Sequence, residues 1–265
     1  AWSSLRHRVR HAETAPHDYL QVVRQHLPAE TNPSIIVNVL DFGRERALEF
    51  LDPTLTESGL SLLRDACLDI ESRADDLGVQ LSARRGWIAV AGTDHVEQLR
   101  AALTSGTAWG LPLDESLRWR ILRRLAELGA TTLEEIDREL AAAPTADATL
   151  AAHTARASLP DASAKERAWS LMTETSREAD AASSAEVRAL AEGFWQRGQD
   201  DITAPYLRDY CAAVSAVATT RGPWVAAALV YSGFPRHRAD PAFLAEVQRS
   251  AVAADTPASV RRLLA

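Results

Sequence analysis

Two histidines, His7 and His11, stand four positions apart near the start of the chain. On a helix this spacing puts both imidazoles on one face, as in the HExxH zinc-binding motif. That motif also needs a glutamate directly after the first histidine as general base, and Arg8 occupies that place. Arg6 and Arg10 add positive charge that opposes a cation. We therefore expect no metal at this histidine pair.

The sequence also lacks the patterns of nucleophilic catalysis and phosphate binding. It has no Gly-x-Ser-x-Gly elbow and no glycine-rich phosphate loop. Its two cysteines, Cys67 and Cys211, each lie in an apolar helical pattern without a histidine nearby. Buried, reduced thiols are the natural interpretation, and they favour a cytoplasmic location. We interpret the acidic pairs as helix caps: Asp75-Asp76, Glu134-Glu135 and Asp200-Asp201.

The stretch Gly193–Asp201 has the composition most typical of a binding surface. It places Trp195, Gln196 and Gln199 on a turn bounded by glycines. Aromatic side chains offer large rigid contact areas, and amides add hydrogen bonds, so such a turn suits contact with a protein or peptide. The alternative is that Phe194 and Trp195 fill the core where two helices meet. Trp119, which stands between Arg118 and Arg120, is likewise expected to be a core residue and not a site residue.

Four amphipathic segments between Leu113 and Trp169 organise the rest of the chain. In the first, Asp114 is placed to cap a helix whose apolar residues recur every three or four positions, and Gly129 stands at the expected C-cap. The second begins at Thr131 or Thr132 and stops before Pro144. Asp147 and Asp161 stand near the starts of the third and fourth helices, and we expect the fourth to end at Trp169. Neighbouring helices must cover the apolar stripes of such hairpins, which is the logic of helical solenoids.

Similar patterns predict helices along the remainder of the sequence. We expect one helix from Thr56 or Ser58 to Leu77, ended by Gly78, and another that starts at about Thr203. Residues 79–91 could form a strand, but their apolar spacing fits a helical face equally well, and we predict a helix there. Residues 175–184 are small and polar, which suggests a surface connection. The predicted fold class is all-α: a curved superhelical stack of roughly fifteen helices in antiparallel pairs, similar to HEAT and armadillo solenoids. The further helices are expected at 1–10, 18–27, 33–40, 44–51, 93–106, 185–194, 224–231, 241–253 and 257–264.

Charge and hydropathy disfavour two classes of partner. The chain of 265 residues has a formal net charge of -7, whereas a surface that follows nucleic-acid phosphates usually needs basic character. No apolar run approaches the ~18 residues of a membrane-spanning helix. We therefore expect neither a nucleic-acid nor a membrane partner. Among the 29 basic residues only Lys165 is a lysine.

The sequence resembles the C-terminal helical domain of aminopeptidase N, as found in bacteria and in particular in actinobacteria. That zinc metallopeptidase family also includes the endoplasmic-reticulum aminopeptidases, and the resemblance covers essentially residues 1–265. It rests on these segments: LDESLRW, RLAELGATTLEEIDREL, APTADATLAAHTARASLP, AKERAW, LAEGFWQRGQDDITAPYLRDY and SGFPR.

The resemblance implies a single non-catalytic C-terminal domain over residues 1–265. In the family, zinc is held by HExxH and a later glutamate in an upstream catalytic domain, which also carries a GxMEN exopeptidase loop. Neither HExxH nor GxMEN is present here. We therefore expect no catalytic residue, no metal ligand and no cofactor in this chain, which alone should be inactive. The implied partners are the upstream catalytic domain and peptide substrates. Arg118, Trp195, Gln196 and Gln199 are the candidates for lining the enclosed active-site chamber or the interdomain contact.

A different class of function stays open. The chain opens on Ala1-Trp2 and stops at Leu264-Ala265 within helical patterns, from which we expect a fragment of a longer polypeptide. The alternative is a free-standing scaffold of the HEAT or armadillo kind that binds a protein partner. An upstream coding sequence with HExxH would decide for the first interpretation, and a start codon just before Ala1 for the second.

Overall fold

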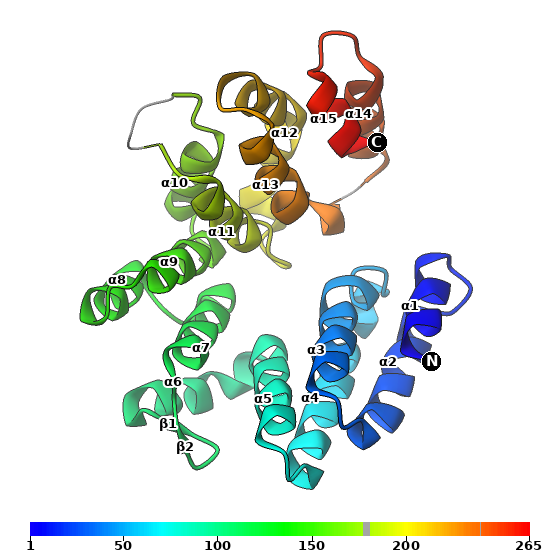
Figure 1. Ribbon diagram of the computed structural model, residues 1–265, viewed down its shortest axis with the longest axis vertical. Coiled ribbons are helices and arrows are strands. Elements are labelled where there is room, and N and C mark those ends of the chain that lie inside the picture. The colour runs from blue at the N-terminus through cyan, green and yellow to red at the C-terminus, as the bar shows by residue number, and fades with distance from the viewer. Residues whose placement is uncertain (177–180, 239) are drawn as a thin grey trace. The chain divides into compact units, whose positions relative to one another are not determined.

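The computed structural model describes residues 1–176, 181–238 and 240–265. Within these ranges the chain forms fifteen α-helices and one two-stranded sheet, so the all-α prediction is confirmed. The chain divides into two compact units, Ala1–Ile121 and Leu122–Ala265. Figure 1 shows the helices of each unit packed side by side in hairpins.

The first unit contains seven helices, the last of which continues into the second unit. They are α1 (Trp2–Arg10), α2 (Pro16–His26), α3 (Pro33–Phe42), α4 (Thr56–Arg73), α5 (Leu77–Val90), α6 (Val96–Ser105) and α7 (Glu115–Glu127). Single-turn 3₁₀ segments at Leu27–Ala29, Pro53–Leu55 and Thr93–His95, and a π-helical turn at Gly43–Ala47, join some of them.

Helix α4 lies between α2 and α5 and forms the centre of the first unit's core. Its buried residues Leu63, Ala66, Cys67 and Ile70 follow the expected spacing of three and four. Burying each large aliphatic side chain of this kind contributes about 1.5–3 kcal/mol. The apolar periodicity of α4 therefore decides which of its faces the neighbouring helices cover.

Residues 79–91 form a helix, as predicted, but the boundary between α4 and α5 was predicted wrongly. Helix α4 ends at Arg73, and Asp76 caps α5 by accepting the backbone N–H of Val79 at 2.9 Å. Gly78 therefore lies in the first turn of α5 instead of ending α4. The second glycine of α5, Gly86, allows a close helix contact, since a Cβ there would lie 2.6 Å from Leu40 Cδ1 on α3.

A short hairpin between α6 and α7 was not predicted. Strand β1 (Thr107–Ala108) pairs antiparallel with β2 (Leu111–Pro112). The two turn residues, Trp109 and Gly110, both have positive φ, at 51° and 75°. This is the backbone of a tight hairpin turn, for which glycine is well suited and tryptophan is not. Two-residue strands are too short to show an alternating pattern in the sequence.

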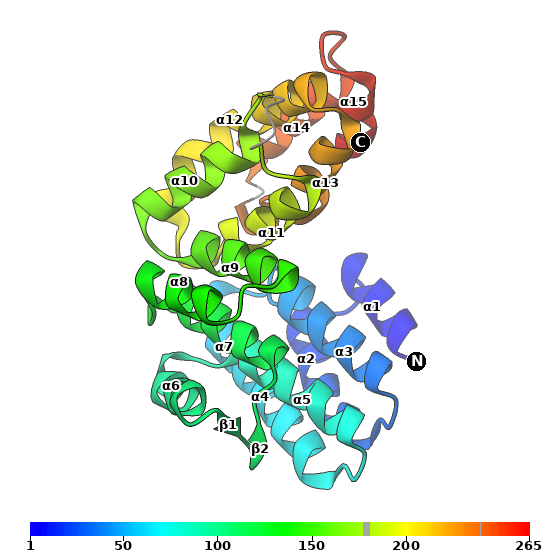
Figure 2. The same ribbon diagram turned by 60° about the vertical axis from the view of Figure 1, so that its left-hand side comes forward.

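The second unit holds the other eight helices among its described residues. They are α8 (Leu133–Ala142), α9 (Ala146–Ser158), α10 (Ala162–Thr173), α11 (Ser184–Phe194), α12 (Asp200–Thr220), α13 (Pro223–Gly233), α14 (Pro241–Val252) and α15 (Ala258–Leu264), with a 3₁₀ turn at Arg236–Arg238. Helices α9, α11, α13 and α15 contact one another in succession, while α10 and α12 pack against them from a second layer (Figure 2).

Most of the predicted caps between α7 and α11 are confirmed. Asp114 accepts the N–H of Leu117 at 2.7 Å, and Gly129 is left-handed with φ 67°. Thr132 starts α8 through a reciprocal capping box with Glu135, whose carboxylate accepts the Thr132 N–H at 3.2 Å. Two orphan backbone donors are satisfied in this way, which fixes where the helix begins.

Other predicted elements differ from the structure. Residues 44–51 do not form an α-helix, because a π-helical turn at Gly43–Ala47 is followed by a turn. Asp147 lies in the first turn of α9, as predicted, and Thr145 caps this helix, because its hydroxyl accepts the N–H of Ala148. Asp161 caps α10 as expected, but the helix continues past Trp169 to Thr173. Helix α12 begins at Asp200 instead of Thr203, since its first residues are acidic and suit the positive end of the helix dipole.

The polar connection predicted over residues 175–184 is partly outside the described residues, which exclude 177–180. At its far end Ser183 caps α11 by accepting the N–H of Glu186, and the Glu186 carboxylate accepts the N–H of Ser183 at 2.7 Å. In the part of the chain that the structure describes, no helix has the length and hydropathy to cross a membrane.

Candidate functional site

The turn between α11 and α12 holds three of the four candidate site residues. Gln196 donates its Nε2 to the carbonyl oxygen of Gly193 at 3.1 Å, which satisfies the end of α11. Gln199 is only 5% exposed, and its Nε2 donates to Ser158 O at 2.9 Å at the end of α9. Both amides thus bond to helix ends, where backbone carbonyls lack partners within the helix. Their contact with a partner stays a prediction.

The third residue of that turn, Trp195, belongs to a cluster of aromatic rings. Phe194 is fully buried, and the Trp195 ring lies 4.8 Å from it in an edge-to-face arrangement. Trp169 and Tyr206 complete the contact around Phe194, with ring centroids 5.5 Å and 5.2 Å away. Pairs of this geometry contribute about 0.5–1.5 kcal/mol beyond area burial. The partly buried Trp195 therefore has a place in the core of the second unit.

The fourth candidate, Arg118, belongs to the first unit, whereas the other three belong to the second. Its guanidinium donates to the carbonyl oxygen of Leu103 at 3.3 Å. The neighbouring Trp119 is buried, which confirms the prediction of a core residue.

A residue that the sequence analysis did not select, Lys165, is fully buried in α10. Its Nζ donates to Ala157 O at 2.6 Å and to Phe194 O at 2.7 Å. Burial lowers the pKa of Lys165 to about 7, although the Glu127 carboxylate raises it. The one available signal in the sequence was its uniqueness, because a chain that otherwise uses only arginine has kept a single lysine here.

The histidine pair and the cysteines do not form a metal site in the described residues. The rings of His7 and His11 lie 4.2 Å apart between centroids, at the arginine-rich end of α1. No group of three or more His, Cys, Asp or Glu side chains that could hold a metal occurs within residues 1–176, 181–238 and 240–265. Cys67 and Cys211 are free and buried, as predicted, and burial raises the pKa of the Cys67 thiol. These donors do not fit a zinc ion.

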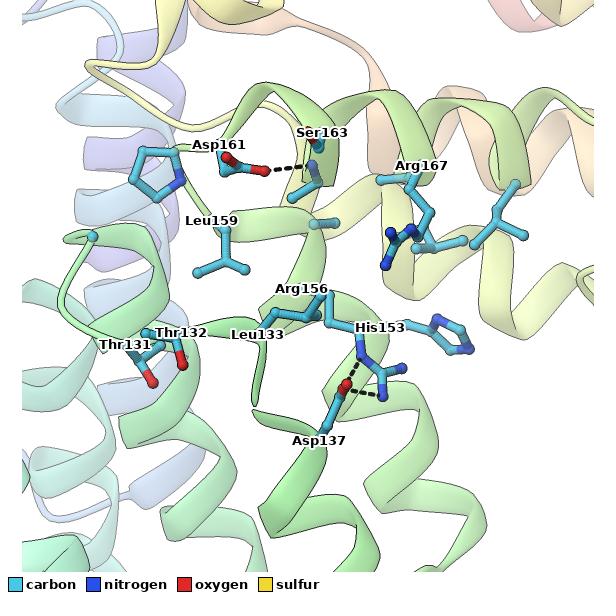
Figure 3. Close-up of a pocket in the computed structure, with 17 residues that line it drawn as sticks. Thr131, Thr132, Leu133, Asp137, His153, Arg156, Leu159, Asp161, Ser163 and Arg167 are labelled. Atoms are coloured by element: carbon cyan, nitrogen blue, oxygen red, sulfur yellow. Dashed lines mark hydrogen bonds and ion pairs between the residues drawn. The ribbon is translucent and has the colours of Figure 1, made fainter. Parts of the chain in front are cut away.

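A pocket of about 550 Å³ lies among α8, α9 and α10 in the second unit. Leu133, Leu159 and Pro160 contribute apolar surface to it. On one side Asp137 Oδ1 accepts two bonds from Arg156, at 2.9 Å from Nε and 2.7 Å from Nη2 (Figure 3). The remaining lining residues are Gly129, Thr131, Thr132, His153, Ala157, Asp161, Ser163, Ala164, Arg167, Ala168, Leu171 and Leu190.

The polar groups of this pocket suit binding better than catalysis. Asp137 is engaged by Arg156, and Asp161 accepts the N–H of Ala164 at 2.8 Å as the cap of α10. His153 lies 3.6 Å from the Glu186 carboxylate, and burial lowers the pKa of its imidazole. The Oδ1 atoms of both Asp137 and Asp161 are thus engaged within the protein. The pocket offers apolar walls with hydrogen-bonding groups at its edge.

Helix α13 carries the most exposed aromatic residue of the described chain. Trp224 is 83% exposed and Tyr231, two turns later, is 68% exposed. The helix, PWVAAALVYSG, contains no charged residue at all. Exposed aromatic side chains on an uncharged helix are typical of a surface that contacts another molecule. The sequence predicts a helix here, but its apolar residues lie on every side, so no pattern indicates which of them the neighbouring helices bury.

Comparison with known proteins gives these surfaces a context. The sequence profile of the ERAP1-like C-terminal domain matches residues 1–265. The chain is also 30% identical to Aminopeptidase N of Streptomyces lividans over 267 residues, which are 99% of this chain and 31% of that protein. The chain thus spans less than a third of the length of this curated relative. The resemblance to the C-terminal region of aminopeptidase N is confirmed, and over its whole length the chain belongs to the family of ERAP1-like C-terminal domains.

Proposed function

We propose that residues 1–265 act together as the non-catalytic C-terminal domain of a longer zinc aminopeptidase, an enzyme that removes N-terminal residues from peptides. The observation that carries this proposal is the pair of coverages: the relative named Aminopeptidase N matches 99% of this chain, but this chain matches only 31% of it. The catalytic zinc would belong to the part of such an enzyme that lies outside this sequence.

The donor set of the chain supports an accessory role. Within the described residues no cluster of His, Cys, Asp or Glu could hold a metal. The two carboxylates of the α8–α10 pocket, Asp137 and Asp161, are engaged by Arg156 and by a helix N-terminus. Zinc hydrolysis needs three protein ligands and an open position for water. We derive no catalytic step for this chain.

The role we propose is to close the active-site chamber of the enzyme and to control which peptides reach it. Rigid helical hairpins are suited to this role because they can move as a body toward or away from a catalytic domain. The α8–α10 pocket and the exposed Trp224 and Tyr231 on α13 are the surfaces available for contact with that domain or with a peptide. The free, buried cysteines fit a cytoplasmic enzyme.

The test compares peptide-length preference in three preparations of the longer polypeptide: intact, without residues 1–265, and without them but with the separate 1–265 chain added back. Each is assayed on an aminoacyl-coumarin and on a peptide of about ten residues. We expect the truncated enzyme to hydrolyse the coumarin substrate but to lose the length preference, and the added chain to restore it. Thermal melts check that the truncated enzyme is folded.

An unchanged ratio of kcat/KM values between the two substrates after truncation would contradict the chamber role. A coding sequence that begins directly before Ala1 would remove the basis for the whole proposal. It would favour instead the free-standing helical scaffold, for which the uncharged aromatic face of α13 would be the partner surface.

A further inference from the structure

Lys165 links the ends of two helices from a third. It lies in α10 and is 0% exposed. Its Nζ donates to Ala157 O, one residue before the end of α9, and to Phe194 O, the last residue of α11. Helix ends carry carbonyls without intrahelical partners, and the negative end of each helix dipole favours a donor there. The Lys165 side chain and these two carbonyls are called the Lys165 junction below.

The turn that follows α11 is bound to the same place. Gln199 donates to Ser158 O at 2.9 Å, next to the residue that Lys165 contacts on α9. Its other side-chain atom, Oε1, is buried and accepts no bond from the described residues. The path of the chain from Phe194 to Gln199 is therefore fixed at one end by Lys165 of α10 and at the other by Ser158 at the C-terminus of α9.

Few charges compensate a cation at the Lys165 junction. Glu127 on α7 attracts it, but the same carboxylate accepts bonds from Arg123 at 3.0 Å and Arg124 at 2.7 Å. The imidazole of His237, in the 3₁₀ turn before α14, interacts with Lys165 as a like charge when protonated. The Phe194 ring lies 5.4 Å from Nζ. On the helices packed against α10, Arg156 pairs with Asp137 and His153 lies beside Glu186. Asp200 lies 3.0 Å from Arg238 and 3.6 Å from His237.

The neutral amine fits the junction as well as the ammonium does. A neutral lysine has two N–H donors, which match the two carbonyls, and it brings no charge out of water. An ammonium adds a third donor and a buried charge. Burial accordingly lowers the pKa of Lys165 from its ordinary value of 10.5 to about 7. In any form where the side chain reaches water, the lysine would again be charged up to about pH 10.

We propose that the Lys165 junction is a pH-sensitive element, in which proton uptake by Lys165 favours an open form that exposes the lysine and releases the turn 194–199. Since the open form binds the proton more tightly, lowering the pH from 9 to 7 increases its population, by about tenfold per pH unit at first. Below about pH 7 both forms are protonated and the population changes no further. This inference does not depend on the proposed aminopeptidase role.

The single lysine makes the test direct, because selective ¹³C labelling of lysine gives the ε-carbon signal of Lys165 alone. We expect this signal to titrate near pH 7 in the folded chain. The matched control is the variant Arg167→Lys, which adds an exposed lysine two positions along the same helix; its second signal should titrate near pH 10. Titration of Lys165 together with the exposed lysine would overturn the proposal.

Amide hydrogen exchange measures the opening itself. After correction for intrinsic exchange rates, protection of the amides in 194–199 should fall about tenfold between pH 9 and pH 8 and stay constant below pH 7. Amides in α4 of the first unit are the internal reference. Equal pH dependence in both places would contradict a role for Lys165. Because both measurements use the unmodified chain, they do not depend on a core variant that folds.

Discussion

Both units bury cations, but they compensate them in opposite ways. In the first unit Arg84 is 6% exposed and its guanidinium donates to the Glu71 carboxylate at 2.9 Å and 2.5 Å. Arg64, also buried, donates to Glu57 and to the carbonyl oxygen of Val90. In the second unit Lys165 contacts two carbonyl oxygens and has only a shared carboxylate nearby.

The two kinds of buried cation differ in how their protonation responds to pH. A guanidinium stays protonated at all ordinary pH values, and its pairing with a carboxylate is therefore insensitive to pH near neutrality. A lysine among carbonyls can lose its proton without losing either hydrogen bond. We therefore expect the stability of the two units to depend differently on pH. We also expect replacement of the buried cation to destabilise each unit for a different reason.

The largest effect should come from breaking the ion pair of the first unit. Arg84→Met leaves the Glu71 carboxylate, which is 20% exposed, without its partner. Removing one member of a buried pair destabilises by about 3–5 kcal/mol. Urea denaturation should show a loss near the lower end of that range. Arg73→Met, which removes an exposed pair with Asp69, is the control and should change stability by less than about 1 kcal/mol. Equal losses for the two variants would remove the distinction.

The next effect tests the close contact beside the Lys165 junction. A Cβ on Gly193 would collide with the carbonyl oxygen of Thr154 on α9, so Gly193→Ala must separate α9 from α11. Overpacking of this kind destabilises by about 1–3 kcal/mol. Gly78→Ala in α5 is the milder comparison, because a Cβ there would lie 3.1 Å from the capping atom Asp76 Oδ1 and 3.5 Å from Pro33 Cγ, and alanine favours the helix. A Gly193→Ala variant as stable as Gly78→Ala would mean that the α9–α11 contact is loose.

A smaller effect follows from the pKa of Lys165. Because that pKa is lowered to about 7 in the folded chain, the unfolded chain binds more protons between pH 7 and pH 10.5, and the free energy of unfolding rises with pH across this window. Between pH 7 and pH 8 the gain should be about 1 kcal/mol. Lys165→Met should be less stable than the wild type but should lack this slope. Denaturation curves at both pH values measure it, and the same slope in the variant would assign the effect to other groups.

The smallest effect on stability is expected on α13. Trp224→Ser and Tyr231→Ser change side chains that are 83% and 68% exposed, so each should alter the free energy of unfolding by at most about 0.5 kcal/mol. Trp195→Ala should instead lower the melting temperature, since Trp195 packs against Phe194. If the α13 variants melted as early as Trp195→Ala, this face would be part of the core.

The helices of this fold were largely predictable because local interactions determine them. Asp114, Thr132 and Asp161 cap helices as their sequence positions indicated, since a cap depends only on residues within one turn. Trp119 lies in the core, as expected. The errors fell where two local signals competed. Gly78 resembled a C-cap, but Asp76 begins the next helix two residues earlier, and Trp109-Gly110 forms a hairpin too short to show periodicity.

The candidate site was less predictable because its contacts are distant in sequence. Gln199 was predicted to contact a partner, yet its side-chain amide donates a hydrogen bond to the carbonyl oxygen of Ser158, 41 residues away. Lys165 was noticed only for being unique, although its partner Phe194 lies 29 residues further along. No periodicity reveals such pairs. The exposure of a side chain is equally hard to predict from sequence. Helix α13 is apolar on every side, so the exposure of Trp224 depends on which neighbouring helices cover the other residues.

The most direct test of the proposed function is an aminoacyl-coumarin hydrolysis assay on the 1–265 chain alone, with and without added zinc. Because the described residues hold no cluster of three metal ligands, we predict no turnover under either condition. The variant His7→Ala/His11→Ala should behave in the same way. Zinc-dependent turnover that disappears in this variant would contradict the account, since it would mean that this chain carries its own catalytic centre.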